Sequence, residues 1–281
     1  MQALHHIARA RTFLFVPANR VERLAKAQQS RADCVIADLE DAVGPDDKKV
    51  ARDLLVAWLD ANPQSRLFVR INALGTGWHD EDVKACRHPG VAGVVLPKAE
   101  TAADVAAVHH QTGKDVLPII ETAAGIHQVV AIAAAEGCAR LLFGKLDLAV
   151  ELNLDPAEDD PEELVFLHFR PQLVLASKLA GLPPPVDGVF TALADPEGLR
   201  RYTLRGKRHG FGALLLIHPL QVPIVAAAFA PSADDVAWAR RVVAAEVASG
   251  GDAVSLDGRM VDAPVIQRAR RILDEVERHP N

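Results

Sequence analysis

Residues 117–147 read LPIIETAAGIHQVVAIAAAEGCARLLFGKLD, and this stretch decides the fold. Its two apolar runs, at 117–120 and 141–143, have the length and composition of buried strands. Between them, the apolar residues of 126–136 recur at helical spacing. A strand, helix, strand unit of this kind makes its two strands parallel neighbours. The stretch therefore predicts part of a parallel β/α sheet.

A carboxylate lies just beyond each of these runs. Glu121 follows the first directly, and Asp147 follows the second after a short turn. Parallel neighbours bring both side chains to the same edge of the sheet, where two oxygen ligands can hold Mg²⁺ and leave positions for water and substrate. Two unrelated surface carboxylates are the alternative interpretation.

The same alternation recurs along the chain. We expect helices at 21–29, 46–59, 126–136 and 162–180, and strands at 13–16, 34–37, 67–71, 93–96, 116–120, 139–143, 185–189 and 213–217. Strand–helix units of this number and size predict a (β/α)8 TIM barrel. A doubly wound open sheet is less favoured, because Pro17-Ala18-Asn19 follows the first strand where a dinucleotide fold has a glycine-rich turn.

The chain continues beyond the needs of a barrel. We expect residues 1–230 to form the barrel domain and residues 231–281 a C-terminal helical and hairpin extension. An alanine-rich helix is expected at 233–249, and Asp257-Gly258 is typical of a hairpin turn. Because this extension has little core of its own, we expect it to pack on the barrel or on a neighbouring subunit.

Composition excludes several classes of protein. The 281 residues are 49% hydrophobic and carry a net charge of −6, so a large core is available and nothing indicates a nucleic-acid surface. The three cysteines have no paired metal spacing, which argues against a disulfide framework or a zinc site. No apolar run approaches the roughly 18 residues of a membrane span. We expect a cytoplasmic protein that does not bind membranes.

The other expected strands also end in polar residues, and in a barrel these ends line the face that carries the active site. They are Asp38, Glu40, Asp41, Arg70, Lys98, Asp187 and His218.

Arg70 has two interpretations. Its guanidinium fork suits a substrate carboxylate, or it forms an ion pair with Glu40 or Asp41. Those two carboxylates are expected to orient Arg70 or a metal-bound water rather than to bind metal directly.

Two further strand-end residues have competing roles. Lys98 is either a Schiff-base lysine or, as we favour, a salt-bridged structural lysine. His218 is more consistent with a hydrogen-bonded or helix-capping histidine than with a base. Arg20 and Lys26 flank the start of the helix at 21–29, where backbone N–H groups favour phosphate, although a solvated helix face is the simpler interpretation.

Short motifs in the right order cover nearly the whole chain, and together they resemble the citrate lyase beta subunit-like proteins of the HpcH/HpaI aldolase superfamily. The motifs are RTFLFVP at 11–17 with Arg20, DLEDAV at 38–43, VRIN at 69–72, LPK at 96–98, IET at 120–122, FG at 143–144 with Asp147, HP at 218–219 with QV at 221–222, and GRMVD at 258–262.

The resemblance implies a Mg²⁺-dependent TIM-barrel lyase, with Mn²⁺ as a possible substitute. Such an enzyme cleaves or forms a carbon-carbon bond beside a carboxylate, often on a coenzyme A thioester. Glu121 and Asp147 match the family's metal ligands, which also places Glu121 at the substrate. Arg70 matches the arginine that binds the substrate carboxylate and takes part in catalysis.

The resemblance also implies positions farther from the metal. Arg20 and Lys26 lie near positions that contact coenzyme A phosphates. Asp262 matches a catalytic aspartate that comes from a neighbouring subunit, which implies a homo-oligomer, a trimer or a hexamer. The chain departs from the family pattern at Ala18, where glycine is common, and at Lys145-Leu146, where small and acidic residues are usual.

Three hypotheses for function follow. The leading one is a lyase acting on malyl-, citramalyl- or citryl-CoA, with Asp262 moving a proton to or from the thioester enolate. The second is an aldolase acting on free 2-oxo acids without coenzyme A. The third is a non-catalytic subunit that binds a metal ion and a keto acid.

Overall fold

The computed structural model describes residues 2–155, 163–248 and 254–278. It divides into two compact units, Met1–Ala226 and Ala227–Asn281. No helix in these described ranges is long and apolar enough to cross a membrane.

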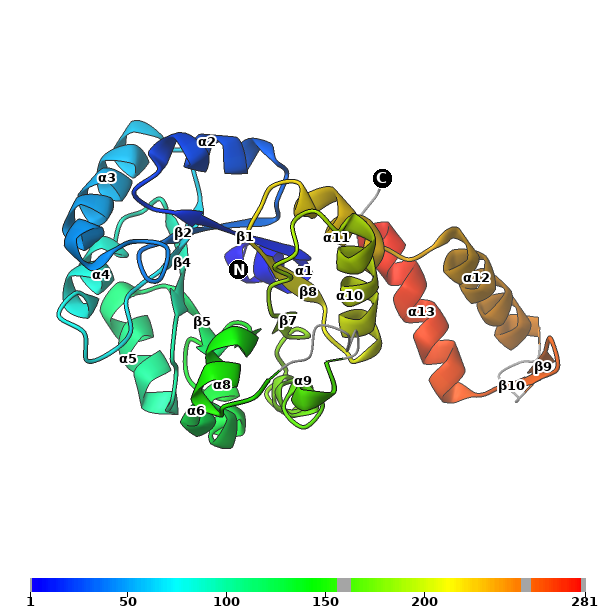
Figure 1. Cartoon of the computed structure of the whole chain (residues 1–281). Helices are drawn as coiled ribbons and strands as arrows, with labels where there is room; N and C mark the ends of the chain where they lie inside the picture. Colours follow the sequence, from blue (N-terminus) through cyan, green and yellow to red (C-terminus); the bar gives the residue numbers. More distant parts are fainter. Residues whose placement is uncertain (1, 156–162, 249–253, 279–281) are drawn as a thin grey trace. The chain divides into compact units, whose positions relative to one another are not determined.

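The first unit is a closed barrel of eight parallel strands that follow one another in sequence order (Figure 1). The ring closes where β1 pairs with β8, with Thr12 opposite Leu214. The strands are β1 (Thr12–Pro17), β2 (Cys34–Asp38), β3 (Leu67–Arg70), β4 (Val91–Leu96), β5 (Asp115–Ile120), β6 (Leu142–Phe143), β7 (Val186–Asp187) and β8 (Ala213–Leu216). The predicted (β/α)8 barrel is confirmed, and the open-sheet alternative is wrong.

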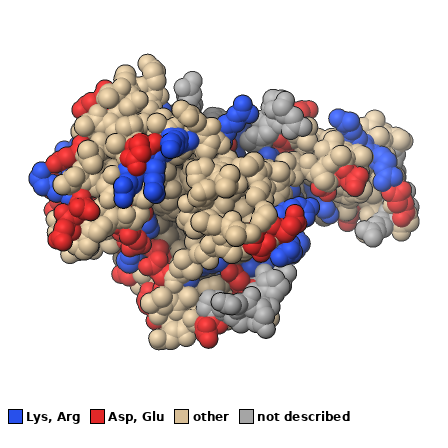
Figure 2. Space-filling model, turned by 45° about the horizontal axis from the view of Figure 1, so that its top comes forward, with Lys and Arg blue, Asp and Glu red and all other residues tan. Residues whose placement is uncertain are grey.

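In Figure 1, one helix, the first, lies at the centre of the view, and the other helices of this unit surround the barrel. The helices are α1 (Gln2–Arg9), α2 (Val21–Gln29), α3 (Lys48–Ala61) after the 3-10 turn η1 (Pro45–Asp47), α4 (His79–Ala85), α5 (Ala102–Thr112), α6 (Ala123–His127), α7 (Val129–Ala133), α8 (Lys145–Glu151), α9 (Arg170–Leu179) after the 3-10 turn η2 (Leu164–Phe166), α10 (Pro196–Arg208) and α11 (Gln221–Phe229). Figure 2 shows Lys and Arg side chains interspersed with Asp and Glu on the face it presents.

Two helices differ from their sequence-based prediction. The helix expected over 126–136 begins earlier, because the Thr122 hydroxyl accepts a hydrogen bond from Gly125 N and caps α6, and the chain then divides at Gln128 into α6 and α7. The helix expected from residue 162, which lies outside the described residues, has its regular part only from Arg170. Pro171 in its first turn favours a helix start and prevents a regular helix from continuing through it.

The interior of the barrel is filled by side chains that point inward from the strands. Phe13 and Phe68 meet edge to face with ring centroids 6.5 Å apart, and both belong to a continuous core. Other members of this core are Ile36, Val95, Leu117, Ile119, Leu142, Val186, Ala213 and Leu215. The barrel is therefore a packed core that holds the strand ends in fixed positions.

The second unit is a helical hairpin with a small core. Helices α12 (Ala233–Ala248) and α13 (Ala263–Arg278) pack together, and between them β9 (Val254–Leu256) pairs with β10 (Arg259–Val261). Asp257 and Gly258 both have positive φ, as the predicted hairpin turn requires. The core between these elements includes the buried residues Ala239, Val242, Val261 and Ala269.

A buried arginine at β6 ties the N-terminal helix to the barrel. Arg140 is 1% exposed, and its Nη1 donates to the carbonyl oxygens of Ile7 and Ala10, each at 2.7 Å. Its Nε donates to the carbonyl of Pro184 at 2.7 Å. Burial lowers the pKa of Arg140 to about 10. The residue therefore satisfies carbonyl groups of three chain positions at once.

Arg140→Met should destabilise the protein strongly, because two buried carbonyls lose their donor. We expect a cost of about 2–4 kcal/mol, which lowers Tm by roughly 5–12 °C in a unit of this size. Calorimetry or thermal circular dichroism measures the change. Arg200→Met, at an exposed position of α10, is the matched control. Equal Tm values for the two variants would contradict this role of Arg140.

Candidate active site

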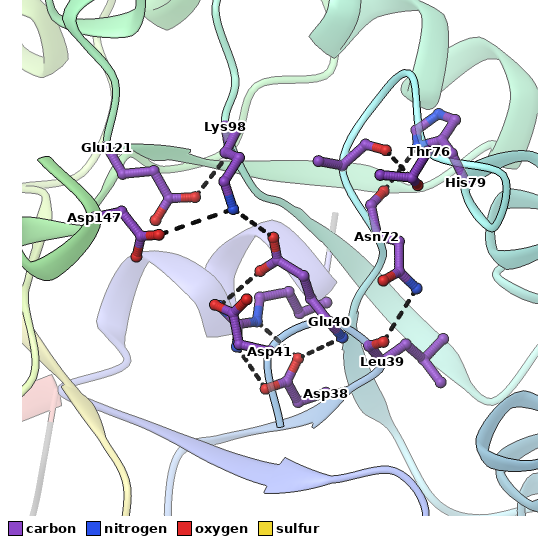
Figure 3. A network of polar contacts seen from close by, with 12 residues as sticks. Asp38, Leu39, Glu40, Asp41, Asn72, Thr76, His79, Lys98, Glu121 and Asp147 are labelled. Carbon is purple, nitrogen blue, oxygen red and sulfur yellow. Dashed lines mark hydrogen bonds and ion pairs between the residues drawn. The ribbon is translucent and has the colours of Figure 1, made fainter. Parts of the chain in front are cut away.

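The carboxyl ends of β2 to β6 bring most of the predicted site residues together (Figure 3). Asp38 and Arg70 are the last residues of β2 and β3. Glu121 follows β5, and Asp147 lies in the first turn of α8 after β6. These four residues line a cavity of about 380 Å³. Its apolar lining includes Phe15, Ile119, Phe143, Val189 and Leu215.

Arg70 is held by three carboxylates. Its Nε and Nη2 donate to the two oxygens of Asp38 at 2.7 and 2.5 Å, while Nη1 lies 2.9 Å from Glu40 Oε2 and 3.3 Å from Asp41 Oδ2. Burial opposes the charge, but the three carboxylates outweigh it and raise the pKa of Arg70. The ion pairs with Glu40 and Asp41 suggested by the sequence are present, and the two-point partner is Asp38.

Glu121 is a buried carboxylate at the centre of the site. It is 2% exposed, and its Oε1 accepts a hydrogen bond from Lys98 N at 2.8 Å. Burial, followed by the negative charges of Asp147 and Glu40, raises the pKa of Glu121 to about 8. A buried carboxylate next to a second one ionises readily only with a cation beside it.

Lys98 lies between Glu40 and the pair Glu121 and Asp147. Its backbone has φ +47, and its ammonium lies 2.8 Å from Glu40 Oε1 and 3.8 Å from Asp147 Oδ1. Burial lowers the pKa of Lys98, but the hydrogen bond to Glu40 and the charges of Glu40, Glu121 and Asp147 raise it further, so the net shift is upward. A Schiff base requires a neutral amine. The salt-bridged lysine that we favoured is confirmed.

The charges of the site are unbalanced in a way that fits a divalent cation. Among the described residues, the charges of Arg70, Lys98 and Lys48 act on five carboxylates, those of Asp38, Glu40, Asp41, Glu121 and Asp147, so full ionisation of these carboxylates leaves a surplus of two negative charges. Carboxylate oxygens are the ligands that Mg²⁺ prefers.

The donor set fits a metal ion that shares its coordination with water and substrate. Lys48 is committed elsewhere, since its ammonium donates to the carbonyls of Leu39 and Glu40 at 2.8 and 2.7 Å. Within the described residues, no group of three or more His, Cys, Asp or Glu side chains is placed to hold a metal ion. A Mg²⁺ ion in this cavity would take Glu121 and Asp147 as its protein ligands and leave its remaining positions to water and substrate.

Arg20, Lys26 and His218 are not among the residues that line this cavity, and Asp262 belongs to the second unit. Arg20 is exposed at the N-terminus of α2, but Lys26 is in its last turn, so the helix dipole favours an anion only near Arg20. Asp262 belongs to the second unit, where its Oδ1 accepts from Val265 N at 3.4 Å at the start of α13. The ring of His218 accepts from Leu220 N at 3.2 Å, which confirms a locally hydrogen-bonded histidine.

Sequence reasoning named Lys145 and Asp187 separately but missed the group of charged residues that they form beside the cavity. Lys145 lines the cavity, and its ammonium pairs with Glu163 at 2.5 Å. Arg170, Asp187 and Arg205 complete this group. The available signals were Lys145, a lysine two residues before Asp147, and Asp187 at the end of an expected strand. The partners are far apart in the sequence and carry no local pattern.

Residues 11–219 match the family model HpcH/HpaI aldolase/citrate lyase. The chain belongs to this family. A family relative, the citrate lyase subunit beta-like protein of Mycobacterium tuberculosis, is 38% identical over 93% of each chain. The (3S)-malyl-CoA thioesterase of Cereibacter sphaeroides is 35% identical over 95% of this chain and 94% of its own.

A solved structure from the family is similar over almost the whole chain. It is the crystal structure of CitE from M. tuberculosis in complex with magnesium, acetoacetate and coenzyme A, with a TM-score of 0.84 and 36% identity. The likeness covers 96% of this chain and 99% of that one.

The absence of a side chain at Gly144 leaves room for the Glu121 side chain. A Cβ at residue 144 would lie 2.2 Å from Glu121 Oε2 and 2.4 Å from Glu121 Cβ. Gly144→Ala should therefore displace Glu121 and weaken Mn²⁺ binding by about 10-fold or more. Electron paramagnetic resonance of free Mn²⁺ measures this affinity, and circular dichroism checks the fold. Gly77→Ala is the control, since a Cβ there meets nothing within 4 Å. Unchanged Mn²⁺ affinity in Gly144→Ala would count against Glu121 as a ligand.

Proposed function

We propose that this chain is a Mg²⁺-dependent carbon-carbon lyase that cleaves or forms a 2-hydroxy or 3-hydroxy acyl-CoA such as malyl-, citramalyl- or citryl-CoA. The observation that carries the proposal is the pair of carboxylates, Glu121 and Asp147, in a cavity with Arg70 and a surplus of two negative charges. The relatives named for citrate lyase and malyl-CoA support the substrate class.

Glu121 and Asp147 would hold the ion, which when bound supplies Lewis-acid stabilisation of negative charge on oxygen. Arg70 would bind the substrate carboxylate with a guanidinium that Asp38 keeps in a fixed orientation. The apolar cavity lining, including Phe15 and Phe143, excludes water and so strengthens these electrostatic interactions.

The reaction requires two proton transfers, one from the substrate hydroxyl and one to the enolate carbon. In cleavage, the hydroxyl gives its proton to water and becomes a carbonyl, the carbon-carbon bond breaks, and the electron pair passes to the thioester as an enolate. Protonation of the enolate carbon then completes the second product. We assign this proton to Asp262 of a neighbouring copy of the chain.

Coenzyme A would lie along the start of α2. Pro17 lines the cavity, and its carbonyl accepts a hydrogen bond from Arg20 N at 3.0 Å. An acyl group in the cavity would therefore lie near the exposed Arg20 side chain and the N-terminus of α2, which attract phosphate. Lys26, also exposed on α2, is assigned a weaker contribution.

We also place the protein in the cytoplasm as a homo-oligomer, a trimer or a hexamer. Cys34, Cys86 and Cys138 are free cysteines, as is usual in a reducing compartment.

The proposed function predicts metal-dependent release of a 2-oxo acid. Purified protein with Mg²⁺ and a panel of hydroxyacyl-CoA thioesters should form a 2-oxo acid, trapped as its phenylhydrazone, while the total thioester absorbance stays constant. Exhaustive chelation should abolish the reaction, and Mg²⁺ or Mn²⁺ should restore it.

The alternatives give different results in the same assay. Loss of thioester absorbance without a 2-oxo acid would indicate a thioesterase. Cleavage of free hydroxy acids by wild type and Arg20→Ala alike would indicate an aldolase without coenzyme A. Metal and keto-acid binding with no turnover would indicate a binding subunit. Turnover that survives chelation would contradict the metal-dependent mechanism.

The shared-site prediction concerns Asp262. Asp262→Ala should be inactive yet bind metal and substrate, and Glu121→Ala should be inactive through loss of the metal. Mixed oligomers of the two variants should regain part of the activity, because some sites combine an intact Glu121 with an intact Asp262. Co-purification of two tags verifies subunit exchange. Inactive hybrids after proven exchange, or a monomer that turns over substrate, would contradict the shared site.

A further inference from the structure

We propose that Lys145 is a positioning residue for Asp147. Its ammonium ties the first turn of α8 to a buried cluster of charged side chains, and this attachment fixes the carboxylate that we assign to the metal. The inference rests on the metal site of the proposed function.

Asp147 depends on α8 for its position. It is the third residue of this seven-residue helix, and its side chain is 41% exposed. Its ion pair with Lys98 Nζ spans 3.8 Å, which is too long for a hydrogen bond. The place of the carboxylate is therefore set mainly by the backbone of the first turn of α8.

Lys145 anchors that turn to a group of side chains that does not include Lys98. It is the first residue of α8, its side chain is 8% exposed, and its Nζ lies 2.5 Å from Glu163 Oε1. The ammonium also lies 4.4 Å from the centre of the Tyr202 ring, a favourable cation-π distance. The stem passes close to Gly188, where a Cβ would lie 2.9 Å from Lys145 Cγ.

The anchor point is itself rigid. Glu163 pairs with Arg170 and, at 3.0 Å, with Arg205, and Arg170 Nε donates to Asp187 Oδ1 at 3.1 Å. The side chains of Arg170 and Asp187 are fully buried. The lysine thus links the metal edge of the barrel to β7, α9 and α10.

The cluster responds unequally to loss of its members. Without the lysine ammonium, Glu163 still has two arginines, so the buried carboxylate stays compensated. Loss of Glu163 would instead remove the carboxylate that Lys145, Arg170 and Arg205 share, and an uncompensated buried charge is strongly destabilising. Lys145→Met, which keeps an unbranched apolar stem, therefore separates positioning of α8 from folding of the barrel.

The test is Mn²⁺ affinity of the full chain, measured by electron paramagnetic resonance. We expect Lys145→Met to raise the Kd by about 10- to 100-fold, the usual effect of losing an interaction that orients a ligand, while cooperative unfolding stays close to that of wild type. Lys178→Met, at an exposed position of α9, should leave the Kd unchanged. Excess Mg²⁺ should restore turnover by Lys145→Met, which general misfolding would not allow.

A Kd for Lys145→Met within twofold of wild type would overturn the inference, as would a loss of affinity that only follows the fraction of unfolded protein. Failure of wild type to bind Mn²⁺ would overturn it as well. The proposed lyase activity fails separately, if wild type binds Mn²⁺ but releases no 2-oxo acid. In that case the comparison of Mn²⁺ Kd values between wild type and Lys145→Met still tests the role of Lys145.

Discussion

The surplus of negative charge at the carboxyl ends of β2 to β6 is the constraint on which the site depends. Glu121 is almost completely buried and stands beside Asp147, and the two repel each other. Burial of like charges is costly unless a cation shares the site. The packed barrel core forces this arrangement, because it fixes the strand ends from which these side chains project. The free energy gained by packing the barrel core therefore offsets the repulsion between these carboxylates, and a bound divalent cation would reduce that repulsion.

Arg70 and Lys98 pair with some of the five carboxylates of the site and leave others for a metal ion. Arg70 holds Asp38 in a two-point pair and also contacts Glu40 and Asp41. Lys98 holds Glu40 and donates its backbone N–H to Glu121. Of the five carboxylates, only Glu121 and Asp147 lack contact with Arg70, and they adjoin the cavity together. The same charges that orient the arginine therefore leave this pair available for a metal ion.

The sequence predicted those features that depend on local pattern and chain order. Glu121 and Asp147 meet because each follows a short apolar run and the intervening helix makes those runs parallel neighbours. The cluster around Lys145 and Glu163 could not be predicted in this way, because it joins residues of α8, α9, α10 and β7 and the start of η2, which share no periodicity. Arg140 was missed for the same reason, since its acceptors Ile7 and Ala10 lie more than a hundred positions away.

Titration calorimetry with Mg²⁺ tests the central claim most directly, namely that the unbalanced charge creates a divalent-cation site through Glu121. Wild type should bind one ion per chain, Glu121→Gln should bind none, and Asp53→Asn, which alters an exposed ion pair on α3, should bind as wild type does. Equal Mg²⁺ affinity in wild type and Glu121→Gln, or no binding by wild type, would contradict the account.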